Sequence, residues 1–387
     1  MSCLTSRLRR KNYNIEIPLK KMEFLVDQKE EETVTRCGYK PGDSLRAYEA
    51  ALLESGAVAT GKALHFSADI LCSGGYDIWV RALWEFAIDH VGVSSPRLFV
   101  YLKKRIYEID EMFKTLPDEA LYNHDDFHTR AGEIVMVLRE VPRRPKVTWP
   151  KVGPETHLNG WIKNVASATE TAVIRRVWKA GGDMTLLRLA GSELLKAITD
   201  GSLEKTLFWV KWLFDEEAHL KKETKGASLT SIHRGPTSTT EVGHFIAELL
   251  AESYKEMATR SMIRMAEEFQ VLLDLWRGAD SRISPAARKK VLGIMAQILC
   301  EVPRWKVPAA PALIKDPVQV SRAVSQAGKF FREVLARPPV KKSTAVLKLF
   351  RSRGVVDAGT RKKKEKESEF QDKLDAYDKV MNAYLSK

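Results

Sequence analysis

The sequence predicts a predominantly all-α protein: two related helical-bundle or solenoid-like halves, a short extended N-terminal segment, and a basic, partly disordered C-terminal tail. Three observations predict this fold. Apolar residues recur at three- and four-residue intervals along most of the chain. No proline lies between Pro154 and Pro236, and an interior proline would cost a helix about 3 kcal/mol. Residues 132–143 also align without a gap on residues 293–304.

The expected organisation follows the chain in order. We predict an N-terminal arm with a short strand (1–40), a first helical half (41–154), a helix-dense connecting block (155–221), a linker or loop (222–240), a second helical half (241–336), a basic tail (337–366) and an amphipathic terminal helix (367–387). In the arm, Ile15, Ile17 and Leu19 alternate with other residues, which is the period of a short strand.

The first helices are predicted from capping residues and glycines. Asp43 or Ser44 is expected to cap a helix that ends near Gly56, and another helix is expected from about Lys62. Gly56 to Lys62 also matches a phosphate-binding loop, but the next residue is Ala63, where Ser or Thr would bind Mg²⁺. A helix end followed by a helix start is therefore the favoured interpretation.

Serine followed by proline marks two further helix starts, at Ser95-Pro96 and at Ser284-Pro285. The first precedes an apolar stripe that needs a covering helix: Leu98, Leu102, Ile106, Ile109 and Phe113. Two more helices are expected between Asp183 and residue 222, separated by Gly201 and Ser202. Four tryptophans on apolar faces are predicted core residues: Trp79, Trp84, Trp209 and Trp212.

The internal repeat shares glycine, leucine and the whole Glu-Val-Pro-Arg sequence, although a four-residue identity can also arise by coincidence. Each copy predicts an apolar helix ended by proline and followed by a proline-rich segment, 143–154 in one copy and 304–317 in the other. Basic residues on both segments are predicted to form anion-binding rims, with plain surface solubility as the alternative: Arg143, Arg144, Lys146, Arg304 and Lys306.

The net charge of +13 comes mostly from the C-terminal tail, because residues 341–366 hold ten lysines and arginines against two acids. Such a run favours anionic partners, DNA or RNA among them, although it also suits a merely solubilising tail. The predicted nucleic-acid contacts are Lys341, Lys342, Lys348, Arg351, Arg353, Arg361, Lys362, Lys363 and Lys364.

The last residues predict an amphipathic helix whose apolar seam is Phe370, Leu374, Tyr377, Met381 and Tyr384. A helix of this length is unstable alone, so we expect it to dock on a protein partner.

Three groups of residues have spacings that metal sites use: His124 with His128, Glu216 with His219, and Glu241 with His244 and Glu252. A helix cap at Asp125 or Asp126 and solvated helix faces are the favoured interpretations, so no metal or cofactor is predicted. No catalytic signature occurs in the sequence, and no catalytic residue is assigned.

Four cysteines without paired spacing favour a reducing compartment. No apolar stretch approaches the roughly 20 residues of a transmembrane helix. An intracellular location, nuclear or cytoplasmic, is expected, with a mitochondrial presequence as the alternative for the arginine-rich start.

Together these patterns predict a non-catalytic helical scaffold or adaptor that acts in a macromolecular assembly near nucleic acid. Direct DNA or RNA binding through the tail and the Pro-Arg loops is the alternative, and a metal-dependent enzyme is a weaker one.

Overall fold

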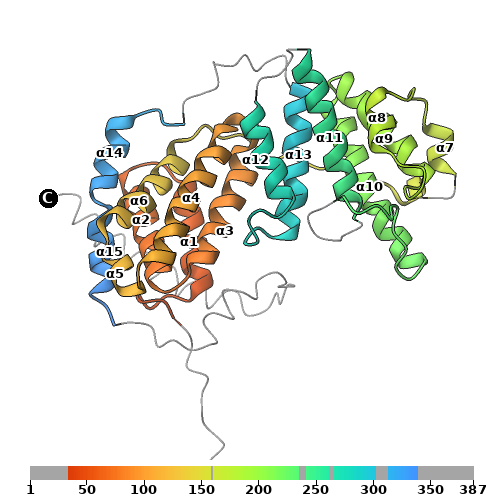
Figure 1. Cartoon of the computed structure of the whole chain (residues 1–387). Helices are drawn as coiled ribbons and strands as arrows, with labels where there is room; N and C mark the ends of the chain where they lie inside the picture. The colour runs from red at the N-terminus through yellow and green to blue at the C-terminus, as the bar shows by residue number, and fades with distance from the viewer. Residues whose placement is uncertain (1–33, 158–159, 235–240, 261–264, 302–312, 339–387) are drawn as a thin grey trace, which may run out of the picture.

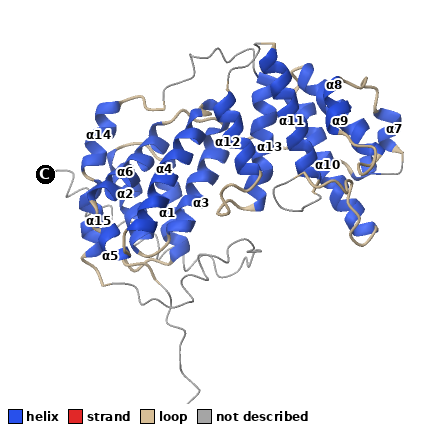
Figure 2. Ribbon diagram, in the orientation of Figure 1, coloured by secondary structure: helices blue, strands red, loops and turns tan. Residues whose placement is uncertain are grey.

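The computed structural model describes residues 34–338, apart from 158–159, 235–240, 261–264 and 302–312. Every regular element in this part of the chain is a helix, which confirms the predicted all-α class (Figures 1 and 2). The predicted N-terminal strand, the basic tail and the terminal helix lie outside the described residues.

The helices form three consecutive groups in the chain. The first is α1 (Pro41–Leu53), α2 (Ala57–Cys72), α3 (Tyr76–Phe86), the π-helical turn η2 (Ala87–Val91), the 3-10 turn η3 (Gly92–Ser94), α4 (Arg97–Thr115), α5 (Asp118–Tyr122) and α6 (Asp125–Glu140). The second is the 3-10 turn η4 (Pro154–His157), α7 (Trp161–Val165), α8 (Ala172–Val177), α9 (Thr185–Thr199), α10 (Leu203–Glu223) and α11 (Val242–Thr259). The third is α12 (Ala266–Trp276), α13 (Pro285–Glu301), α14 (Pro317–Ser325) and α15 (Ala327–Leu335).

The groups lie side by side in an elongated arrangement (Figure 1). Helices α12 and α13 stand in the middle, between α1–α6 on one side and α7–α11 on the other. Helices α14 and α15 come from the segment predicted as the second half, yet they pack against α2 and α6 of the first. The main hydrophobic core therefore runs from Ala47 to Val334 and includes residues of both predicted halves. A small second cluster of Met136, Val320 and Ala323 joins α14 to α6.

The structure confirms several predicted helix boundaries. Ser202 is the N-cap of α10, and Gly201 has the positive φ of +67° that favours glycine at a helix end. The Ser284 hydroxyl accepts a hydrogen bond from the Ala287 amide at 3.3 Å, as expected for the start of α13. The four tryptophans predicted as core residues are all buried.

Three predicted caps are wrong. Helix α1 begins at Pro41, before Asp43 and Ser44, and the Ser44 hydroxyl instead donates to the buried carboxylate of Asp69 at 3.0 Å. Helix α6 is capped by the side chain of His124, which accepts from the Asp126 amide at 3.2 Å. Neither Asp125 nor Asp126 therefore caps α6.

The third wrong cap lies at the start of α4, which has Pro96 at its N-cap position and no side-chain cap. The Ser95 hydroxyl is buried, and within the described part of the chain it has no hydrogen-bond partner. Helix α2 also begins at Ala57, earlier than the expected start near Lys62, because Gly56 reverses the chain at a φ of +96°.

The two copies of the internal repeat form similar helix ends in different surroundings. Helix α6 ends at Glu140 and α13 ends at Glu301, the same residue of the repeat. Helix α6 packs against α2, α14 and α15, whereas α13 packs against α10, α11 and α12. Among the described helices the packing gives no evidence of two related halves, so the duplication stays a prediction.

The shared glycine of the repeat allows a close contact in both copies. A Cβ atom on Gly132 would lie 2.6 Å from the Cβ of Ala327 in α15, and one on Gly293 would lie 3.2 Å from the Trp149 ring. The first neighbour is a rigid atom of another helix. Glycine at position 132 is therefore what lets α15 approach α6.

We expect Gly132→Ala to lower the free energy of unfolding by about 1 to 3 kcal/mol, because α15 must move away from α6. Chemical denaturation measures the change. Gly181→Ala is the matched control, since a Cβ at that exposed position meets no atom within 4 Å. Equal stability of the two variants would contradict the packing described here.

A set of polar contacts joins α3 and α4 to the loop before α13. Arg282 pairs with Asp280 at 2.8 Å and with Asp110 of α4 at 2.9 Å, and its guanidinium lies over the Tyr76 ring. The indole N–H of Trp84 donates to Asp280 at 2.9 Å. We call these five residues the Arg282 cluster, and they fix how the first group of helices sits on α12 and α13.

Candidate functional site

The basic residues predicted on the segment after α6 lie together, and each contacts other parts of the protein. Arg143 donates to the carbonyl oxygens of Leu52 at 2.6 Å and Leu53 at 3.0 Å, at the end of α1. Its guanidinium also lies over the Phe86 ring. Carbonyl groups at a helix end lack partners within the helix, so Arg143 stabilises the last turn of α1.

Arg144 and Lys146 bind acidic residues from two other segments. Arg144 donates to both carboxylate oxygens of Glu301, at 3.1 and 3.4 Å, and its amide donates to the His90 carbonyl at 3.0 Å. Lys146 pairs with Asp89 at 3.0 Å. Glu301 thus compensates the charge of Arg144, whereas Lys146 is 59% exposed and shares Asp89 with Lys290.

The π-helical turn η2, which follows α3, contains the partners of Lys146 and of the Arg144 amide. It carries Asp89, which also binds Lys290 at 2.7 Å. Burial works against ionisation of Asp89, but hydrogen bonds from Lys290 and Lys146 outweigh it and hold the pKa of this carboxyl below its usual value. The widened turn therefore anchors the loop with a charged carboxylate.

The predicted anion-binding rim is only partly within the described residues. Arg143, Arg144 and Lys146 share one loop, whereas Arg304 and Lys306 lie outside the described part of the chain. Anion binding by either loop stays a prediction.

A pocket of about 460 Å³ lies between residues 144–150, the first turns of α10 and one face of α13. Its volume is in the range of small-molecule sites. Val147, Leu203 and Leu207 contribute apolar surface, and Gln297 is a polar residue of the wall. Sequence reasoning missed this pocket, because α10 and α13 are far from the loop in the chain.

Further along the same segment, His157 contacts one of the predicted Glu-x-x-His pairs. Its Nδ1 lies 2.5 Å from Oε2 of Glu216, and its ring is stacked with those of Trp212 and His219. His219 itself lies 3.4 Å from Glu223. The sequence indicated Glu216 and His219, but nothing in it indicated that His157 joins them.

The residues of the other predicted metal pairs each contact different partners within the protein. His128 lies 2.7 Å from the Tyr122 carbonyl through Nε2 and stacks on Phe331 of α15. His244 accepts from the Trp276 indole N–H at 3.3 Å, and Glu252 pairs with Lys255 at 2.5 Å. Within the described ranges, no group of three or more His, Cys, Asp or Glu side chains has a metal-binding arrangement.

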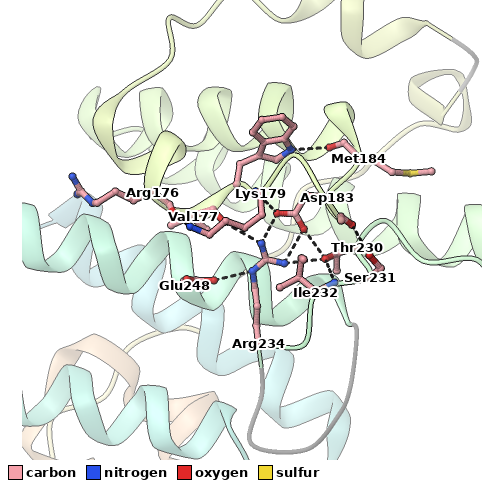
Figure 3. A network of polar contacts seen from close by, with 12 residues as sticks. Arg176, Val177, Lys179, Asp183, Met184, Thr230, Ser231, Ile232, Arg234 and Glu248 are labelled. Atoms are coloured by element: carbon pink, nitrogen blue, oxygen red, sulfur yellow. Dashed lines mark hydrogen bonds and ion pairs between the residues drawn. The ribbon is translucent and has the colours of Figure 1, made fainter.

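A buried ion pair joins the segment before α9 to the segment before α11 (Figure 3). Arg234 donates to Asp183 at 2.8 Å, and their side chains are 6% and 0% exposed. Thr230 donates to the same carboxylate at 2.6 Å, and Glu248 pairs with Arg234 at 2.8 Å. Burial opposes ionisation of Asp183, but the hydrogen bonds from Arg234 and Thr230 keep its pKa below the usual value.

The described cysteines are free thiols, namely Cys37, Cys72 and Cys300. Burial raises the pKa of all three, and that of Cys72 reaches about 12. Because the thiolate is the reactive form, these thiols are expected to react slowly.

Four histidines have lowered pKa values in the folded protein, so we expect the protein to lose stability in acid. Burial lowers the pKa of His65 to about 3, and it also lowers the pKa of His90, His128 and His244 below 6.5. The unfolded chain takes up these protons near pH 6.5, whereas the folded chain takes them up at lower pH. Falling pH therefore favours unfolding, by up to about 1.4 kcal/mol per pH unit for His65, while the other three histidines act in the same direction.

Denaturant titrations at pH 7.5 and 5.5 measure this loss, and His65→Phe should make it smaller. Equal stability at both pH values would contradict the prediction.

The remaining predicted site residues all lie beyond residue 338 and so outside the described residues. They are Lys341, Lys342, Lys348, Arg351, Arg353, Arg361, Lys362, Lys363 and Lys364 for nucleic acid, and Phe370, Leu374, Tyr377, Met381 and Tyr384 for partner docking.

No protein-family model, curated protein or solved structure matches the chain. In the described part of the chain, no helix combines the length and apolarity needed to cross a membrane.

Proposed function

We propose that this chain is a non-catalytic helical scaffold or adaptor of an intracellular macromolecular assembly, nuclear or cytoplasmic, that acts near nucleic acid. The observation that carries the proposal is the distribution of charge. Residues 341–366 hold ten basic residues against two acids, and the predicted docking helix follows them directly. Basic tails of this kind attract phosphate groups and acidic protein surfaces.

The packing of α15 supports the proposal, because the tail begins directly after it. Phe330, Phe331 and Val334 are buried against the first group of helices. Arg36 donates to the carbonyls of Leu335 and Arg337, both at 3.5 Å. The body thus holds the chain firmly up to the point where the basic tail starts, as a scaffold requires.

The internal pairing of the loop charges also supports a role for the tail. Arg144 pairs with Glu301 and Lys146 with Asp89, and the longest uninterrupted run of basic residues in the sequence is Arg361 to Lys364. Substitutions in the tail should therefore weaken the binding of negatively charged partners more than substitutions in the loop.

Docking of the terminal helix is tested in the full chain with Leu374→Asp/Met381→Asp, which puts two charges on the predicted apolar seam. Ala376→Asp/Ala383→Asp adds the same charge off the seam and is the matched control. Quantitative co-purification should lose specific partners only with the seam variant. Identical partner sets for both variants would overturn the adaptor role of this helix.

Direct DNA or RNA binding is the alternative function, and the run Arg361 to Lys364 favours it. Fluorescence anisotropy with unrelated DNA and RNA, at low and physiological salt, compares the full chain with Lys362→Gln/Lys363→Gln/Lys364→Gln and with a version that ends at Ala336. Each lost phosphate contact should reduce the salt slope on duplex DNA by about 0.9.

Tight, salt-sensitive binding that both variants weaken would promote the nucleic-acid function. No binding by the full chain would leave acidic protein partners as the reason for the basic tail.

A further inference from the structure

A threonine on the loop after α6 has the surroundings that a protein kinase needs in its substrate. We propose that Thr148 is a phosphorylation site for a serine/threonine kinase that selects basic residues beside its target. The proposal does not depend on the scaffold role, since none of the residues involved belongs to the basic tail or the terminal helix.

The side chain of Thr148 is exposed, and within the described part of the chain it makes no hydrogen bond. Other exposed threonines are engaged with their own helices. The hydroxyls of Thr115 and Thr199 donate to the carbonyl oxygens of Glu111 and Leu195, both at 2.9 Å. At position 148 a hydroxyl is therefore available to a kinase without the loss of an existing contact.

The backbone around Thr148 can enter an active site. Residues 145–152 form neither helix nor strand, and no backbone hydrogen bond joins them to another described residue. Pro145 and Pro150 also favour an extended chain, since proline restricts its own φ and the residue before it. A kinase must bring its target hydroxyl in line with the γ-phosphate of ATP. This segment can do so without the unfolding of a helical turn.

The charge of the loop indicates which class of kinase fits. Residues 143–151 hold four basic residues and no acid, namely Arg143, Arg144, Lys146 and Lys151. Lys146 lies two residues before Thr148 with its side chain 59% exposed, and Lys151, three residues after it, is exposed as well. An acidic enzyme surface is complementary to such a loop, and complementary charge speeds association about tenfold or more.

The reaction exchanges one bond to phosphorus for another. The γ-phosphoryl group leaves ADP and bonds to Oγ1 of Thr148, and the hydroxyl proton passes to the catalytic carboxylate of the kinase. The product carries a charge of about −2 and lines the same pocket as Lys146. Lys146 is free to turn toward it, because Asp89 keeps Lys290 as a second cation at 2.7 Å. Phosphorylation thus cancels roughly half of the positive charge of the loop.

The test incubates the full chain with ATP, Mg²⁺ and purified serine/threonine kinases that select basic residues beside their target, and mass spectrometry follows each site over time. Thr148 should be modified about tenfold faster than Thr169. Thr169 is the matched control within the chain, because it is exposed on an irregular segment, follows five residues without a basic side chain, and precedes Glu170. A kinase that selects acidic residues beside its target should leave Thr148 unmodified.

Three variants identify the cause of the selectivity. Thr148→Ala should remove the fast phase and leave the slow modification of Thr169 unchanged. Lys146→Gln removes an exposed charge beside the target, so the rate at Thr148 should fall about tenfold. Lys163→Gln, at an exposed position of α7, is the matched control and should leave that rate unchanged.

Equal rates at Thr148 and Thr169, or no modification of Thr148 by any of these kinases, would overturn the proposal. A synthetic peptide of residues 142–153 shows whether the fold covers the site. Rapid modification of the peptide with the full chain untouched would mean that the folded protein hides Thr148, and the proposal would fail. Equal rates in Lys146→Gln and Lys163→Gln would refute selection by the basic loop.

Discussion

Replacing Asp183 with alanine should lower the free energy of unfolding by about 3 to 5 kcal/mol. The reason is that Arg234 would keep its charge at a position where its side chain is only 6% exposed. Glu248 would remain as a partner, but its own side chain is 40% exposed and contacts only Nε. Urea or guanidinium unfolding of the full chain measures the change.

Two comparisons isolate the cause of that loss. Asp200→Ala removes the same side chain from an exposed pair with Lys196, where we expect less than about 1 kcal/mol. A double change, Asp183→Leu with Arg234→Met, removes both buried charges and should recover much of the lost stability. If Asp183→Ala costs no more than Asp200→Ala, the ion pair does not stabilise the fold as described.

Arg282→Met should cost about 2 to 3 kcal/mol and loosen the contact of α12 and α13 with the first group of helices. The guanidinium holds Asp280 and Asp110, and its hydrogen bond outweighs burial to keep the pKa of Asp280 low. Without it, two carboxylates of the Arg282 cluster lose their cationic partner. Trp84, which donates to Asp280, would then be attached to an uncompensated charge.

Chemical denaturation gives the total effect, and hydrogen exchange shows where it arises. Exchange should accelerate first in α12 and the start of α13. Arg260→Met is the matched control, because it breaks an exposed pair with Glu256 that joins nothing across helices. Equal losses in the two variants would mean that the Arg282 cluster does not join the helix groups.

Hydrophobic spacing was sufficient to predict the helical class and several local boundaries. The stripe before residue 113 became α4, and the Gly201-Ser202 break separates α9 from α10. The wrong cap at Ser44 has a tertiary cause. Ser44 could have capped a helix, but a buried carboxylate from α2 took its hydroxyl, and that carboxylate is 25 residues away in the chain.

The candidate site could be predicted in part. Arg143, Arg144 and Lys146 were identified from proline-stiffened basic sequence, and they do gather on one loop. Their partners were not identified, because an acidic residue in a helix has no local sign of what it will contact.

By itself, then, the sequence determined that this protein is helical and that its excess positive charge is concentrated near its end, because helix period and charge runs are local properties. The tertiary structure alone decided which polar groups meet. Arg144 finds Glu301 across 157 residues and Asp183 finds Arg234 across 51. Burial in one shared core brings such groups together, and their distances in space cannot be read from their spacing in the chain.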